Sequence, residues 1–84
     1  MYEVYIERSA ERDLKRLSVE NFHRMVSHIK ALGKNPRPAG SRKIIGSEND
    51  WRIRVGKYRI IYEVDDNAKA VKVMKIRTRG EAYR

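Results

Sequence analysis

The chain is 84 residues long, contains no cysteine and carries a formal net charge of +9, from 20 Lys+Arg against 11 Asp+Glu. The lack of cysteine excludes disulfides, thiolate metal sites and cysteine nucleophiles, and no apolar run approaches the ~18 residues of a membrane span. The N-terminus lacks the plan of a signal peptide, so we expect a cytoplasmic protein. We expect a single domain, residues 1–84, whose basic charge favours nucleic acid or an acidic protein as its partner.

The N-terminal half predicts one strand and two helices. Apolar and polar side chains alternate over residues 2–7, which is typical of a half-buried strand. Ser9 is the expected N-cap of a short first helix, Ser18 that of a second, and Gly33 the expected end of the second. The second helix carries an apolar stripe at three- and four-residue spacing: Val19, Phe22, Met25, Val26, Ile29 and Leu32. The helices should form a hairpin whose stripe is covered by a sheet.

The C-terminal half predicts strands. Residues 43–46 are at most a brief extended piece, whereas 51–55 and 58–64 are strand-like runs joined by Gly56-Lys57, a typical type II′ hairpin turn. Residues 70–76 form a further strand. The order β-α-α-β-β-β predicts an α+β fold, in which the N-terminal helical hairpin packs on one face of a small, largely antiparallel sheet.

The Gly56-Lys57 turn fixes the register of the hairpin, because directly opposite residues share a face of the sheet. One face carries Trp51, Ile53, Val55, Tyr58, Ile60, Tyr62 and Val64. The other carries Arg52, Arg54, Arg59, Ile61 and Glu63. The first set is the expected core, and the second gathers three arginines, with Arg54 directly across from Arg59.

This arginine cluster has two interpretations. Like charges directly opposite each other destabilise a sheet, and the guanidinium fork donates bidentately to phosphate oxygens, so the cluster favours a phosphate-binding site. A solvated outer face that is rich in arginine is the alternative, and it is the better explanation for any single one of these residues.

The last strand has an irregular apolar pattern. Val71 and Val73 share one parity, and Met74 and Ile76 share the other. The assignment of this strand's faces is therefore ambiguous, and a β-bulge there would turn the following residues to a new direction.

Three features of the chain resemble the RelE/ParE toxin superfamily. They are the order β-α-α-β-β-β, the run from 51 to 64 (WRIRVGKYRIIYEV), and the ending from 79 to 84 (RGEAYR). The ending is similar to the RelE branch, especially its archaeal-type members. The RelE enzymes of this family are ribosome-dependent mRNA endonucleases that a cognate antitoxin holds inactive.

The resemblance implies an active site without metal or cofactor. Two basic residues stand two apart on the strand before the turn, here Arg52 and Arg54. A third follows the aromatic residue that opens the next strand, here Arg59. The last two residues are an arginine just after the final strand, placed on Arg79, and a tyrosine, here Tyr83.

The match to the RelE pattern is not uniform. Arg77 competes with Arg79 for the C-terminal arginine role, and Arg77 and Lys57 are candidate RNA contacts. The best-known RelE branch has lysines at the first two positions, where this chain has arginines. Many relatives carry a histidine where this chain has Thr78, so an acid of that kind is not expected. The ParE branch generally lacks the basic set and the tyrosine, whose presence therefore favours the nuclease.

The chemistry implied is attack of the RNA 2′-hydroxyl on a phosphate that the arginines hold. Arginine has a pKa above ~12 and is a poor base. Tyr83 therefore either acts as the base or stacks on a nucleobase. The expected partners are an acidic or amphipathic RelB-like antitoxin, mRNA and the ribosome, with no membrane. The alternatives are a ParE-like protein-binding toxin without nuclease activity, and a decayed RNA-binding homologue.

Overall fold

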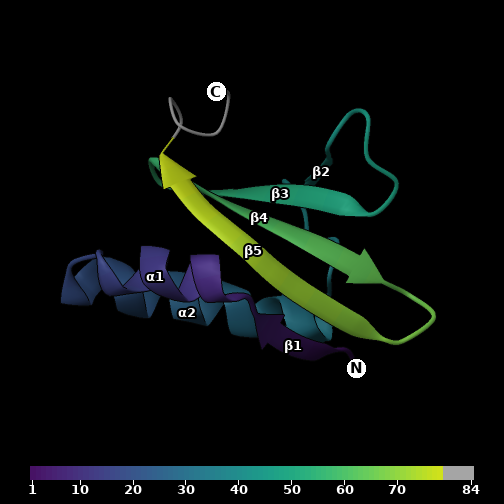
Figure 1. The fold of residues 1–84 in the computed structure, drawn as a ribbon, viewed down its shortest axis with the longest axis horizontal. Helices are drawn as coiled ribbons and strands as arrows, with labels where there is room; N and C mark the ends of the chain where they lie inside the picture. Colours follow the sequence, from purple (N-terminus) through teal and green to yellow (C-terminus); the bar gives the residue numbers. More distant parts are fainter. Residues whose placement is uncertain (79–84) are drawn as a thin grey trace.

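A computed structural model describes residues 1–78 of the chain, and it contains the predicted elements in the predicted order (Figure 1). The N-terminal half forms β1 (Glu3–Ile6), α1 (Arg8–Lys15) and α2 (Val19–Lys34). The C-terminal half forms β2 (Arg42–Lys43), β3 (Asp50–Val55), β4 (Tyr58–Asp65) and β5 (Ala70–Thr78). None of the helices in this part of the chain has the length and apolar character needed to cross a membrane.

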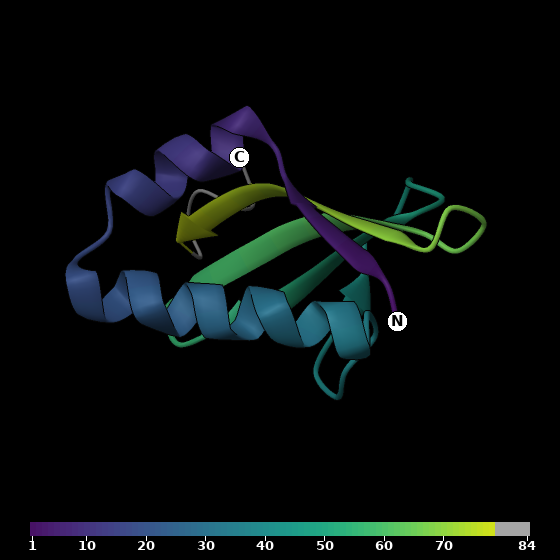
Figure 2. The same cartoon turned by 90° about the horizontal axis from the view of Figure 1, so that it is seen from below.

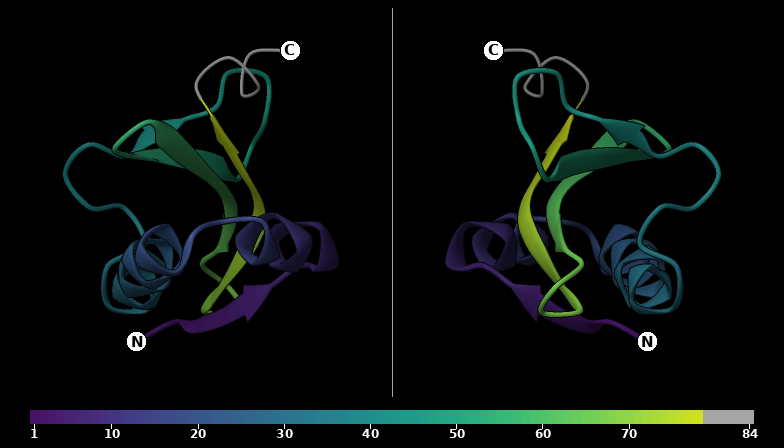
Figure 3. Two further views of the ribbon diagram at one scale, coloured as in Figure 1. Left: turned by 90° about the vertical axis from the view of Figure 1, so that its left-hand side faces the viewer. Right: turned by 90° about the vertical axis from the view of Figure 1, so that its right-hand side faces the viewer.

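The strands form one sheet in the order β1-β5-β4-β3-β2, with β1 parallel to β5 and the other pairs antiparallel. Both helices lie on the same side of this sheet (Figure 3). The parallel β1–β5 pair follows from the connectivity, because the chain leaves β1 through the helices and returns to the sheet much later. The predicted α+β fold, with a helical hairpin on one face of a largely antiparallel sheet, is confirmed.

The core lies between the helices and the sheet, and it contains the predicted face of the β3–β4 hairpin. The pairs Val55–Tyr58, Ile53–Ile60 and Trp51–Tyr62 occur in the predicted register. The buried apolar residues of the strands and helices form one cluster: Ala10, Leu14, Met25, Ile29, Leu32, Ile53, Val55, Ile60, Tyr62, Val64, Val71, Val73 and Ile76. The face of the sheet away from the helices, called the outer face below, is thus left to the polar residues.

The helix ends differ from the prediction at Ser9. The first helix begins at Arg8 with Glu7 at its N-cap position, whereas the Ser9 hydroxyl donates a hydrogen bond of 2.6 Å to the carbonyl of Met74. Ser9 was therefore wrongly predicted as a cap, because it lies inside the first turn of the helix and its hydroxyl donates to the edge of β5. Ser18 is confirmed as the cap of α2, since its hydroxyl accepts a hydrogen bond from the Asn21 N–H.

Gly33 was predicted to end α2, but the helix continues to Lys34. Its role is close packing: a Cβ at this position would lie 3.1 Å from the Tyr2 carbonyl oxygen and 3.1 Å from Val4 Cγ2. The Tyr2 N–H donates to the Gly33 carbonyl at 2.8 Å. Figure 2 shows the start of β1 beside the end of α2. Glycine here allows the first strand to approach the helix backbone.

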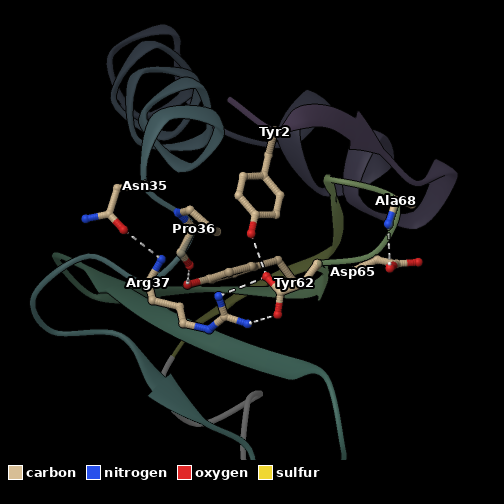
Figure 4. Close-up of polar contacts among 8 residues, drawn as sticks. Tyr2, Asn35, Pro36, Arg37, Tyr62, Asp65 and Ala68 are labelled. Carbon is tan, nitrogen blue, oxygen red and sulfur yellow. Dashed lines mark hydrogen bonds and ion pairs between the residues drawn. The ribbon is translucent and has the colours of Figure 1, made fainter.

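A cluster of polar side chains around Asp66 joins three distant segments (Figure 4). Arg37, after α2, donates to both Asp66 carboxylate oxygens at 3.2 and 2.8 Å. Tyr2 donates to Oδ1 of the same carboxylate at 2.5 Å, and the Arg37 guanidinium lies 5.2 Å from the Trp51 ring centroid. The N-terminus, the segment after α2 and the β4–β5 turn are thereby held together.

The Asp66 cluster is expected to make the folded protein slightly less stable at low pH. Hydrogen bonds from Arg37 and then Tyr2 lower the Asp66 pKa from 3.8 to about 2. A lowered pKa in the folded state stabilises the protein above pH 3.8, and this contribution is lost as the pH falls toward 2. We expect Asp66→Asn to lower the Tm at pH 6, and the Tm difference from the wild type to disappear near pH 2. A difference that stays constant from pH 6 to pH 2 would contradict this account.

Candidate nucleic-acid interface

A row of three arginines crosses the outer face near the Gly56-Lys57 turn of the β3–β4 hairpin. Arg54 of β3 is paired with Arg59 of β4, and Arg59 is paired with Arg77 of β5. Directly opposite residues in a sheet have their Cβ atoms about 5 Å apart. Backbone register alone therefore places the Cβ atoms of three arginines side by side.

A second basic row lies beside the first and contains a residue that the sequence analysis missed. Arg42 of β2 is paired with Arg52 of β3, Arg52 with Ile61, and Ile61 with Lys75. A pocket of about 400 Å³ opens on this face, and it is lined by Gly40, Arg42, Arg52 and Arg54. The sequence signal for Arg42 is weak, because β2 has two residues and its register cannot be deduced from periodicity.

The positive charge is confined to one end of the outer face. At the other end, Asp50 is paired with Glu63, and the Glu63 carboxylate lies 3.9 Å from the Lys72 ammonium. The face is thus divided into a basic half near the Gly56-Lys57 turn and a more balanced half near the β4–β5 turn. An anionic ligand would be drawn to the basic half.

The predicted arginines differ in exposure. Arg54 is exposed and Arg52 is half-buried, whereas Arg59 is 2% exposed. Arg59 lies on β4, the middle strand of the sheet. An enclosed cation acts on a nearby anion more strongly than a solvated one, since water screens it less.

The change of parity in the last strand left a β-bulge open, and β5 contains one. Tyr62 is paired with Val73 and Ile61 with Lys75, so Met74 is the additional residue. The shift keeps Ile76 in the core, and it turns the side of β5 that carries Arg77 toward the outer face. The bulge therefore aligns Arg77 with the row of arginines.

The end of β5 is held by side chains of α1. The Asp13 carboxylate oxygen Oδ2 accepts hydrogen bonds from the Ile76 N–H at 2.9 Å and from Arg77 Nη1 at 2.5 Å. Together with the Ser9 hydroxyl on the Met74 carbonyl, this contact satisfies backbone groups of β5 beyond the end of β1. Arg77 belongs to the row by its register, while its guanidinium is directed to Asp13 at the sheet edge.

The remaining predicted residues belong to the Gly56-Lys57 turn or to the C-terminal segment of the sequence. Gly56 has a φ of 60°, which suits the first central residue of the predicted turn. Lys57, next to it, places its ammonium 5.5 Å from the Tyr58 ring centroid. Arg79 and Tyr83 lie outside the described residues. Within residues 1–78, no group of three or more His, Cys, Asp or Glu side chains is arranged to hold a metal ion.

The chain is thus a small α+β domain whose sheet is covered by helices on one face and carries arginines on the other, an arrangement chemically suited to phosphate groups. The comparisons with known proteins give the family. The model of the ParE toxin of the type II toxin–antitoxin system parDE matches residues 4–83. Toxin RelE1 of Methanocaldococcus jannaschii is 30% identical over 86 aligned positions, which cover 99% of this chain and 96% of the relative.

Solved structures agree with this assignment. RelE in the archaeal RelE–RelB complex of Pyrococcus horikoshii superposes with a TM-score of 0.84 at 28% identity, over 94% of this chain and 96% of that one. The isolated E. coli RelE toxin has the same fold, with a TM-score of 0.81 at 21% identity, over 99% of this chain and 92% of that one. The chain belongs to the RelE/ParE superfamily, as a RelE-type toxin of a toxin–antitoxin system.

Proposed function

We propose that this toxin is a metal-independent endoribonuclease that cuts mRNA on the ribosome. The observation that carries the proposal is the row Arg54–Arg59–Arg77 on the outer face, with the Arg42–Arg52 pair beside it. A sheet shaped for stability alone does not place like charges directly opposite one another. Anionic phosphates of an RNA strand offset that repulsion.

The reaction we propose is a transesterification. The 2′-hydroxyl oxygen forms a bond to phosphorus, the bond from phosphorus to the 5′-oxygen breaks, and a 2′,3′-cyclic phosphate and a free 5′-hydroxyl result. The proton of the 2′-hydroxyl passes to a base, for which Tyr83 is our candidate, and the leaving oxygen gains a proton. Preorganised donors to the phosphate are each worth about 10²–10³ in rate.

The arginines have different parts in this proposal. Arg59 and Arg79 hold the phosphate that is attacked, and Arg52 and Arg54 supply further donors. The Asp13 contact with Arg77 favours Arg79 for the C-terminal role, because it directs the Arg77 guanidinium to the sheet edge. Among the proposed donors within residues 1–78, Arg59, with 2% exposure, is the one that water screens least.

The proposed partner in the cell is an antitoxin that keeps the enzyme inactive in the cytoplasm. The Pyrococcus horikoshii relative is a complex of RelE with RelB. A RelB-like segment with acidic side chains suits the net charge of +9.

A protein-binding toxin without nuclease activity is the second candidate. The observation that favours it is the family match, which is to the ParE model over residues 4–83. In that case the outer face would bind an acidic protein surface, and no RNA would be cut.

The test is cleavage of a translated mRNA in a reconstituted translation system, with and without ribosomes. We expect site-specific cuts by the wild type, and a loss of about 100-fold or more in Arg79→Ala and Tyr83→Phe. Arg8→Ala, which removes a charge at the start of α1, serves as the control and should cut like the wild type. Folded wild-type protein that cuts no mRNA under either condition would show that the protein-binding reading is the better one.

A further inference from the structure

A second pocket, called the edge pocket here, lies where α1 meets the start of β4 and the end of β5. Its volume is about 330 Å³, at the lower end of the ~300–1,000 Å³ that small-ligand sites occupy. Its lining residues are Asp13, Arg16, Leu17, Tyr58, Ile76 and Arg77. Within residues 1–78, none of the residues assigned above to the attacked phosphate lines it.

The lining of the edge pocket combines two cations with an aromatic ring and apolar side chains. Arg16 is exposed at the C-cap of α1, and Arg77 reaches the pocket from β5. Tyr58 is half-buried, and the Lys57 ammonium lies 5.5 Å from its ring centroid, which adds a third positive charge nearby. Leu17 supplies an apolar wall next to the ring.

Asp13 fixes the orientation of Arg77 and leaves part of its guanidinium for a ligand. Within residues 1–78, the hydrogen bonds of this guanidinium to the Asp13 carboxylate and to the Ile76 carbonyl are both made by Nη1. A guanidinium has five N–H donors, so donors remain for a phosphate. The side chain is thus preorganised by one anion and able to bind a second.

We propose that the edge pocket binds one nucleotide of single-stranded RNA next to the cleaved one. Its base would lie against Tyr58 and Leu17, and its phosphate would contact Arg16 and Arg77. The row of arginines connects the outer face to the edge pocket along the proposed course of the RNA strand, because Arg77 is directly paired with Arg59 and also lines the pocket. This inference rests on the proposed function, and it extends the RNA site from the outer face around the sheet edge.

The lining favours RNA over an acidic protein segment. An aromatic ring stacks on any nucleobase but gains little from a carboxylate. The Asp13 carboxylate accepts hydrogen bonds from amino groups of bases. The edge pocket therefore contains arginines for the phosphate of a nucleotide, an aromatic ring for the face of its base, and a carboxylate for the polar edge of the base.

The test is the affinity of the full chain for a single-stranded 2′-O-methyl RNA hexamer, which cannot be cut, measured by fluorescence anisotropy at several salt concentrations. The matched pair is Arg16→Ala and Arg12→Ala, since both remove one exposed arginine from α1 and Arg12 does not line the pocket. We expect Arg16→Ala to weaken binding several-fold and to lower the salt slope by about one, with the effect of Arg12→Ala below twofold.

A second pair tests stacking. We expect Tyr58→Leu, which keeps an apolar side chain against the core, to weaken binding about fivefold or more, and Tyr58→Phe to bind like the wild type. Thermal unfolding monitored by circular dichroism checks that both variants are folded.

The outcomes separate this inference from the proposed function. If Arg16→Ala and Tyr58→Leu bind the hexamer like the wild type while Arg54→Ala binds it weakly, the edge pocket is not an RNA site and the outer face is. If the wild type binds no hexamer but cuts mRNA on the ribosome, the inference is overturned and the proposed function stands; if it does neither, the proposed function itself is wrong. If Arg16→Ala weakens only the binding of a glutamate-rich peptide, the pocket belongs to a protein interface and the inference is overturned.

Discussion

Replacing Arg59 with alanine is expected to lower mRNA cleavage by about 100–1000-fold, the loss that follows removal of one preorganised donor to a charge that develops in the reaction. Arg59 is the middle member of the row Arg54–Arg59–Arg77 and is 2% exposed. Its charge is therefore the least screened of the three. Cleavage rates under single-turnover conditions measure the effect, because they report the chemical step and exclude product release.

The size of the Arg59 effect can be separated from loss of folding and from loss of charge. Arg59→Lys keeps the positive charge but loses the bidentate fork, so it should recover only part of the rate. Lys72→Ala is the control on the same face, since Lys72 lies beside Glu63 in the balanced half. A folded Arg59→Ala protein that cuts as fast as Lys72→Ala would rule out a role for Arg59 in the reaction.

The parts of the fold that depend on neighbouring residues were predictable from the sequence. The Gly56-Lys57 turn sets the β3–β4 register, and alternation along the two strands then assigns each side chain to a face. The bulge at Met74 was visible as a change of parity in the apolar residues of β5. Each of these signals spans a few residues, where geometry leaves few choices.

The errors arose where distant segments meet. Ser9 has the residue type of a cap, but a carbonyl 65 residues away accepts its hydrogen bond. Gly33 has the residue type of a helix end, but the start of β1 needs the space that its missing side chain leaves. Local propensity cannot distinguish these roles, because the competing partner is supplied by the tertiary fold.

In the candidate site, too, the residues set by short-range signals were predicted and those set by distant contacts were missed. Arg52, Arg54 and Arg59 follow from the hairpin register, and all three lie on the outer face as predicted. Arg42 and Asp13 were missed, because a two-residue strand has no periodicity and the Asp13 contact with Arg77 spans 64 residues. Both residues modify the predicted site: Arg42 adds a charge, and Asp13 directs Arg77 to the sheet edge.

Asp13→Ala is expected to lower the free energy of unfolding by about 2–3 kcal/mol, a large change for a domain of this size. The substitution removes two hydrogen bonds at once, one to the Ile76 N–H and one to the Arg77 guanidinium. The Asp13 side chain is 11% exposed and the Arg77 side chain 29%, so water replaces these bonds incompletely. Urea unfolding followed by circular dichroism measures the loss.

Two comparisons identify the cause of this loss. Asp13→Asn keeps an acceptor for the Ile76 N–H but loses the charge, so its effect should lie between those of Asp13→Ala and the wild type. Glu11→Ala removes a carboxylate from the same helix, where its partner Lys15 is 3.3 Å away and both side chains are exposed, so its cost should stay below about 1 kcal/mol. If Asp13→Ala is no less stable than Glu11→Ala, then the contact does not hold the end of β5. If it is less stable by the expected amount, the strand that leads into Arg79 and Tyr83 is anchored to α1 by one carboxylate.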